Sequence, residues 1–145
     1  MMMMKTAWPL LIASLLAVAA GAQSSPVGVW KTIDDKTGEA KSHLEIYEQG
    51  GEYHGKVVKL LKSEPDKKCT ECPGKKKNQP IMGMVVVEGL KPQDGHWKKG
   101  KILDPENGSE YGCTVWFEKG KPDELKVRGI HWTGLYRTQT WYRVK

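Results

Sequence analysis

The sequence lacks the motifs by which many hydrolases, nucleotide-binding enzymes and metalloenzymes are recognised. It has no GxSxG nucleophile motif, no phosphate-binding P-loop and no HExxH or HxH pair. No two carboxylates are spaced for acid–base work, and Asp104 before Pro105 is typical of a turn. We therefore expect a protein that is not an enzyme and uses no metal or cofactor. The four histidines are scattered along the chain: His43, His54, His96 and His131.

Charge is nearly absent from the first 33 residues, where only Lys5 and Lys31 are charged. Lys5 is followed by an apolar run, residues 7–20, and residues 20–22 (Ala-Gly-Ala) match a small-x-small cleavage site. This pattern predicts a signal peptide over residues 1–22 and an exported domain, periplasmic or secreted, over residues 23–145. The alternative is a membrane anchor, but the run contains Pro9 and is shorter than the roughly 20 residues needed to span a bilayer.

Helical periodicity is also missing, since no stretch of three turns or more carries an apolar stripe. Short alternating segments separated by Gly, Asn, Asp and Pro predict about eight strands instead. The stretch from Trp97 to Cys113 shows the pattern best, with a turn at residues 104–108 between two strands. Consecutive hairpins of this number predict an all-β fold: one antiparallel up-and-down barrel. The expected strands span residues 27–33, 41–48, 53–61, 85–90, 101–103, 111–117, 125–130 and 138–144.

The first and last strands of such a barrel are neighbours. Gly28 and Trp30 lie in the first and Arg143 lies in the last, so the arginine is expected to pack across the indole at the barrel floor. The combination of Gly-x-Trp, a terminal-strand arginine and eight strands resembles the lipocalin and fatty-acid-binding barrels, the calycin group.

Cysteine is scarce, with three residues in the chain. Cys69 and Cys72 form a CxxC, for which a disulfide, a zinc knuckle and a redox pair are the alternatives. Export favours the disulfide, because exported proteins fold in an oxidising compartment. The zinc knuckle would need two further ligands, and the redox pair would need a helix N-terminus at its first cysteine. Cys113 is expected to be a buried, inert thiol on its strand.

The chain is basic, with a formal net charge of +6. Lysines gather in an irregular segment, Lys62 to Gln79, which is long for a compact domain and therefore expected to be functional or mobile. Export argues against nucleic acid as the partner and favours contact with anionic lipid, polymer or a protein of the cell envelope.

Phenylalanine occurs once, against six tryptophans and five tyrosines. Aromatic rings with a polar group suit a cavity or its rim, although tryptophans could equally fill the barrel interior. An arginine turned inward would need an anionic partner. The candidate ligand-binding residues are therefore Tyr111, Arg128, Trp132, Tyr136 and Arg137.

Several motifs together resemble the bacterial secreted family catalogued as domain of unknown function 2147. They include Gly28-x-Trp30, Cys69-x-x-Cys72, Asp104-Pro105-x-x-Gly108 and the final Arg137-Thr138-Gln139-x-Trp141-x-Arg143. The resemblance implies an exported lipocalin-like barrel without an assigned activity. The favoured function is binding of a small hydrophobic or amphipathic molecule in the barrel. The alternative is an envelope interaction module that displays the lysine-rich segment.

Overall fold

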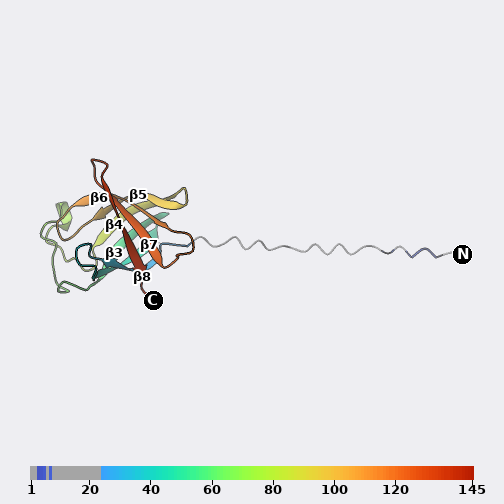
Figure 1. The fold of residues 1–145 in the computed structure, drawn as a ribbon, viewed down its shortest axis with the longest axis horizontal. Helices are drawn as coiled ribbons and strands as arrows, with labels where there is room; N and C mark the ends of the chain where they lie inside the picture. The colour runs from blue at the N-terminus through green and yellow to red at the C-terminus, as the bar shows by residue number, and fades with distance from the viewer. Residues whose placement is uncertain (1–2, 6, 8–23) are drawn as a thin grey trace.

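The computed structural model describes residues 3–5, 7 and 24–145, so the predicted signal peptide lies outside the described residues apart from residues 3–5 and 7. Within these described residues, eight strands and one short helix follow in order (Figure 1). They are β1 (Gly28–Ile33), β2 (Ala40–Gln49), β3 (Glu52–Leu60), η1 (Gly74–Lys76), β4 (Val85–Gln93), β5 (His96–Leu103), β6 (Glu110–Phe117), β7 (Glu124–Ile130) and β8 (Tyr136–Arg143).

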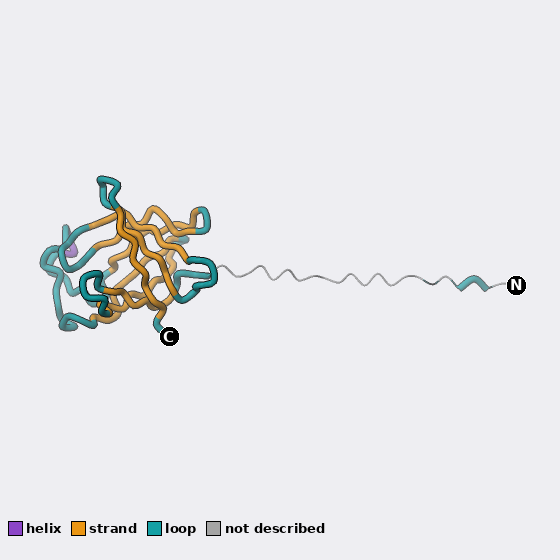
Figure 2. Tube along the Cα trace, in the orientation of Figure 1, coloured by secondary structure: helices purple, strands orange, loops and turns teal. Residues whose placement is uncertain are grey.

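Each strand pairs antiparallel with the next, and β8 pairs with β1, so the sheet closes into a barrel. The predicted eight-stranded up-and-down barrel is confirmed. The closing register places Trp30 opposite Arg143 and Lys31 opposite Tyr142. Figure 2 shows the strands as a cylinder with loops at both ends, the long β3–β4 loop (residues 61–84) lying at one of them. Among the described residues, no helix is long and apolar enough to cross a lipid bilayer.

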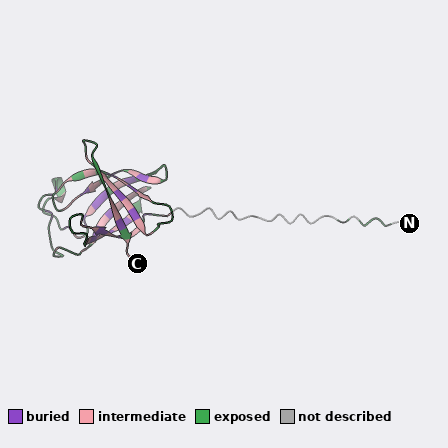
Figure 3. Ribbon diagram, in the orientation of Figure 1, coloured by how far each residue is buried: buried purple, intermediate pink, exposed green. Residues whose placement is uncertain are grey.

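Alternation along the strands separates the barrel interior from its surface (Figure 3). On β7, for example, Leu125 and Val127 are buried, while Lys126 and Arg128, which alternate with them, are only partly covered. One continuous apolar core results, with Trp30, Ile46, Leu90, Val115 and Leu125 among its most deeply buried members.

One end of the barrel is closed by Trp30, which is completely buried. Its Nε1 donates a hydrogen bond to the Pro26 carbonyl at 2.8 Å, and the Arg143 guanidinium lies 4.3 Å from the ring centroid. A contact of this kind stabilises a fold by about 0.5–2 kcal/mol. Gly28 has a φ of +142°, and a Cβ there would lie 2.7 Å from Arg143 Nη1, so only glycine lets the guanidinium approach.

Arg143 also ties neighbouring segments to this closed end. It donates hydrogen bonds to the carbonyls of Val27, Ser25 and Pro122, and its Nε lies 3.3 Å from Asp123 Oδ1. One side chain therefore joins the segment before β1, the β6–β7 turn and the last strand, which explains how an otherwise open cylinder is sealed here.

Cys113 is expected to resist thiol reagents while the protein is folded. The thiol is buried inside the barrel, and burial raises its pKa to about 12, so almost no reactive thiolate exists near neutral pH. Iodoacetamide at pH 8 should modify it only after denaturation, as mass spectrometry of the intact protein would show. Rapid labelling of the native protein would contradict this placement.

Candidate functional site

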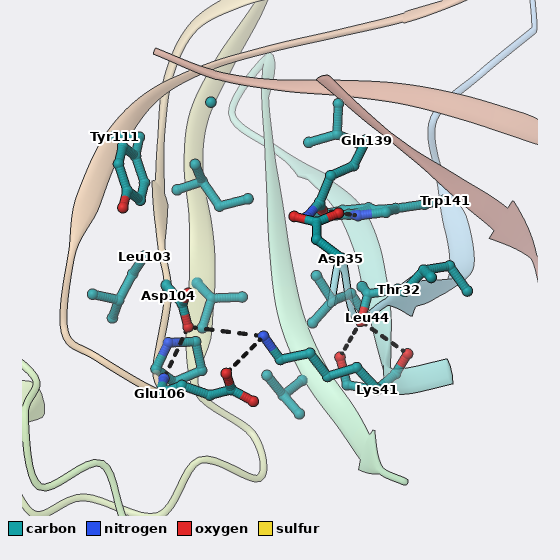
Figure 4. A pocket seen from close by; sticks show the side chains of 18 of the residues that line it. Thr32, Asp35, Lys41, Leu44, Leu103, Asp104, Glu106, Tyr111, Gln139 and Trp141 are labelled. Carbon is teal, nitrogen blue, oxygen red and sulfur yellow. Dashed lines mark hydrogen bonds and ion pairs between the residues drawn. The ribbon is translucent and has the colours of Figure 1, made fainter. Parts of the chain in front are cut away.

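The end opposite Trp30 opens into a cavity of about 440 Å³ inside the barrel. This volume is within the range of small-molecule sites, about 300–1,000 Å³. The deep wall is apolar, and Trp141 and Tyr111 face it from β8 and β6 (Figure 4). The apolar lining side chains are Ile33, Leu44, Val57, Leu60, Ile81, Val86, Ile102, Leu103, Pro105, Val127, Leu135 and Trp141.

The polar groups that face the cavity bond mainly to one another. The buried hydroxyls of Thr32 and Ser42 share a hydrogen bond of 2.7 Å, and Trp141 Nε1 donates to Gln139 Oε1 at 3.1 Å. No buried side-chain nitrogen or oxygen lacks a partner within the described part of the chain. The interior therefore demands few hydrogen bonds from an occupant, and burial of apolar surface would dominate binding.

Ion pairs surround the mouth of the cavity. Asp35 accepts hydrogen bonds from Arg137 at 3.1 Å and from Gln139 at 2.7 Å, which joins the β1–β2 turn to β8. Lys41 reaches across from β2 to Glu106 at 3.4 Å and Asp104 at 3.9 Å (Figure 4). These groups are partly exposed, so each pair contributes about 0–1 kcal/mol and can open at low cost.

Comparison with known proteins identifies the family of this chain. Residues 28–143 match the family described as "Uncharacterized protein conserved in bacteria (DUF2147)". The chain belongs to this family. The match spans the barrel from β1 to β8 and so includes the closed end, the cavity and its mouth.

The DUF2147 barrel is similar to a solved structure described as "Protein HP1028 from the human pathogen Helicobacter pylori belongs to the lipocalin family". The two share 21% sequence identity with a TM-score of 0.71, over 83% of this chain and 84% of that chain. At this identity the likeness establishes a lipocalin-like fold. No curated protein matches the DUF2147 chain in sequence.

Two of the sequence motifs typical of DUF2147, Cys69-x-x-Cys72 and Asp104-Pro105-x-x-Gly108, lie in contact beside the cavity mouth. The predicted disulfide between Cys69 and Cys72 is confirmed, and both cysteines are buried. The disulfide segment packs on the β5–β6 turn: Cys69 Sγ lies 3.2 Å from the Pro105 carbonyl oxygen. At Gly108, with a φ of +73°, an added Cβ would overlap the Glu71 carbonyl. The disulfide segment and the β5–β6 turn therefore pack against each other beside the cavity mouth.

The β3–β4 loop is also ordered by its own hydrogen bonds and by charge. Cys69 N donates to the Gln79 carbonyl at 2.8 Å and Asn78 N to the Cys69 carbonyl at 2.7 Å, which forms a short ladder. Lys62 bonds to Asp34 at 3.1 Å, linking the loop to the β1–β2 turn. The Lys36 backbone N–H and then the Lys62 ammonium lower the pKa of the Asp34 carboxyl. The predicted irregular segment is therefore a structured rim.

Three of the five predicted ligand-binding residues line the cavity or its mouth: Tyr111, Tyr136 and Arg137. The Tyr111 hydroxyl has no hydrogen-bond partner in residues 24–145 and is free to bind an occupant. Arg128 lies on the outer face of β7 instead, 4.9 Å from the Trp116 ring centroid and 4.2 Å from that of Tyr136. Trp132 lies outside the cavity, with 89% of its surface exposed.

Several residues that line the cavity were not among the predicted ligand-binding residues, including Asp35, Lys41, Gln139 and Trp141. The period of two on β8 carried a usable signal, because Gln139 and Trp141 are in phase with Arg137. Asp35, in the β1–β2 turn, and Lys41, at the start of β2, had no such signal, since their distance from β8 depends on barrel closure. Among the described residues, no three His, Cys, Asp or Glu side chains are arranged to hold a metal ion.

Proposed function

We propose that this protein is an exported, non-enzymatic binding barrel for a small amphipathic molecule with a substantial apolar part. The observation that carries the proposal is the cavity of about 440 Å³, apolar in its depth and bordered by polar side chains at its mouth. The apolar part of the ligand would lie against Leu44, Val57, Val127 and Trp141.

The polar end of the ligand would remain at the mouth. Tyr111 offers an unpaired hydroxyl, and Arg137 could exchange Asp35 for an acceptor on the ligand because their ion pair is solvent-accessible. The lysines and arginine of the mouth are matched by Asp35, Asp104 and Glu106, so net attraction for an anion is small there. Shape and apolar burial, rather than charge, would then select the ligand.

A substitution that fills the cavity should abolish binding. Gly129 faces inward on β7 and lines the cavity, where an added Cβ would meet Tyr111 at an ordinary 3.6 Å. Gly129→Leu should therefore place a side chain in the ligand's space without breaking the sheet. We expect a loss of at least about tenfold in affinity, since burial of a large apolar group contributes about 1.5–3 kcal/mol.

The measurement is titration with 1-anilinonaphthalene-8-sulfonate followed by displacement with dodecanoic acid and dodecanol. Gly112→Leu is the matched control, because Gly112 lies on the outer face of β6 with Ile130 at an ordinary 3.7 Å. It should bind like the unmodified protein. No binding by the unmodified protein, or equal binding by the Gly129→Leu variant, would overturn the proposal.

A further inference from the structure

The tip of the β7–β8 hairpin (residues 130–137) projects from the barrel (Figures 1 and 3). It carries exposed apolar side chains. Trp132 is 89% exposed, Leu135 75% and Tyr136 64%. Large apolar side chains grouped at one protruding point are unusual on a soluble monomer and mark an interaction surface.

The tip is an ordered turn, so this exposure is specified by the structure. His131 N donates to the Leu135 carbonyl at 2.7 Å, and Gly134 N donates to the His131 carbonyl at 2.9 Å. The His131 ring bonds to the Thr133 hydroxyl at 2.8 Å. Among the described residues the Trp132 ring meets one aromatic neighbour, His131, at 5.4 Å. The turn therefore holds the indole outward.

Cations flank the tip. Arg128 precedes it on β7 and Arg137 ends it on β8, and no Asp or Glu occurs after Glu124 in the sequence. Arg128 makes no ion pair within residues 24–145 and spans the rings of Trp116 and Tyr136. The β3–β4 loop at the same end of the barrel adds Lys68, Lys75 and Lys77, also without an ion pair in that part of the chain.

We infer that the hairpin tip inserts into the headgroup region of an anionic lipid bilayer. Trp and Tyr favour that depth, and flanking cations complement the negative lipid surface. A second copy of the chain fits worse, because two such tips would bring like charges together. A narrow convex tip also suits a deformable bilayer better than a rigid protein groove.

The position of the tip links docking to the cavity. Leu135, Tyr136 and Arg137 belong to the tip and also line the cavity mouth. A docked protein would therefore hold its mouth close to the lipid surface, where an amphipathic ligand could pass between bilayer and barrel without crossing water. This second step rests on the proposed function, whereas the docking itself does not.

The test is co-sedimentation of the mature protein with vesicles of phosphatidylglycerol and phosphatidylcholine, compared with phosphatidylcholine alone. We expect binding to the anionic vesicles, weakened when salt is raised from about 0.1 M to about 1 M. Trp132→Ser should weaken it about tenfold or more. Tyr142→Ser is the matched control: Tyr142 is an exposed aromatic of β8 near the closed end, so its loss should leave vesicle binding unchanged.

Dye binding in solution separates the two proposals, because Trp132 lies outside the cavity. The Trp132→Ser variant should bind 1-anilinonaphthalene-8-sulfonate normally without vesicles. If the unmodified protein binds the dye but not the vesicles, the docking is overturned and the proposed function stands. If it binds the vesicles but not the dye, the proposed function is overturned and the docking stands. Vesicle binding lost on changing Lys75 and Lys77 to Glu but retained in Trp132→Ser would overturn the docking in favour of the loop. Self-association that depends on Trp132, without vesicle binding, would overturn it in favour of a second copy.

Discussion

Trp30→Ala is expected to lower the free energy of unfolding by about 3–5 kcal/mol, the range for removal of a buried tryptophan. The indole is completely buried, lies 5.9 Å from the Phe117 ring and carries the Arg143 guanidinium on its face. Its removal leaves a cavity at the barrel floor and deprives Arg143 of its support. Because small domains are stable by only about 5–15 kcal/mol, one substitution would remove a large share of the total.

Urea denaturation followed by far-UV circular dichroism would measure the effect. Trp30→Phe is the graded control, since it keeps a ring beneath Arg143 but loses the Nε1 hydrogen bond to Pro26. It should lose about 1–2 kcal/mol, which keeps the prediction testable even if the alanine variant fails to fold. Equal stability of Trp30→Phe and the unmodified protein, together with a loss below about 1 kcal/mol for Trp30→Ala, would show that this end is sealed by other contacts.

Gly108→Ala is expected to cost about 2–5 kcal/mol, far more than the same change at Gly38. Both glycines have a φ of +73° and end turns of the same kind, in which the glycine N–H bonds to the carbonyl of an aspartate four residues earlier. Their surroundings differ. An added Cβ at Gly38 meets nothing within 4 Å, whereas at Gly108 it overlaps the Glu71 backbone carbonyl.

The comparison separates backbone strain from steric overlap. Gly38→Ala should cost only the strain of a left-handed alanine, about 1–2 kcal/mol. Gly108→Ala should add displacement of the disulfide segment, and limited proteolysis should then cut the β3–β4 loop faster. Equal losses of stability at the two positions, measured by urea denaturation, would mean that the packing of this segment on the turn contributes little.

Much of the barrel could be read from local patterns. Alternation of apolar and polar residues and the Gly, Asn and Asp turns reflect the geometry of each strand and hairpin by itself. Trp30 and Arg143 lie in the first and last strands, which any closed meander brings together. The fifth strand was predicted too short, at residues 101–103, because Lys99, with a φ of +62°, interrupts the alternation of β5 (His96–Leu103).

The candidate site was less accessible to sequence reasoning. Arg128 and Arg137 looked alike as inward-facing cations, yet Arg128 belongs to the outer face of β7 and Arg137 to the mouth on β8. The Asp35 carboxylate that pairs with Arg137 comes from a turn about 100 residues earlier in the chain. Such pairs form only when the first and last strands close the sheet.

The sequence alone determined an eight-stranded meander and a sealing tryptophan and favoured a disulfide, because these follow from neighbouring residues or from strand order. Tertiary structure decided that the interior is partly open. Three inward glycines look equivalent in the sequence, but at Gly100 the space is occupied by Leu90 and at Gly55 by Val87, while Gly129 borders the cavity. Whether the space beside a glycine is filled depends on the side chain that the neighbouring strand brings to the same level, and this is set by the register and bulges of the closed barrel.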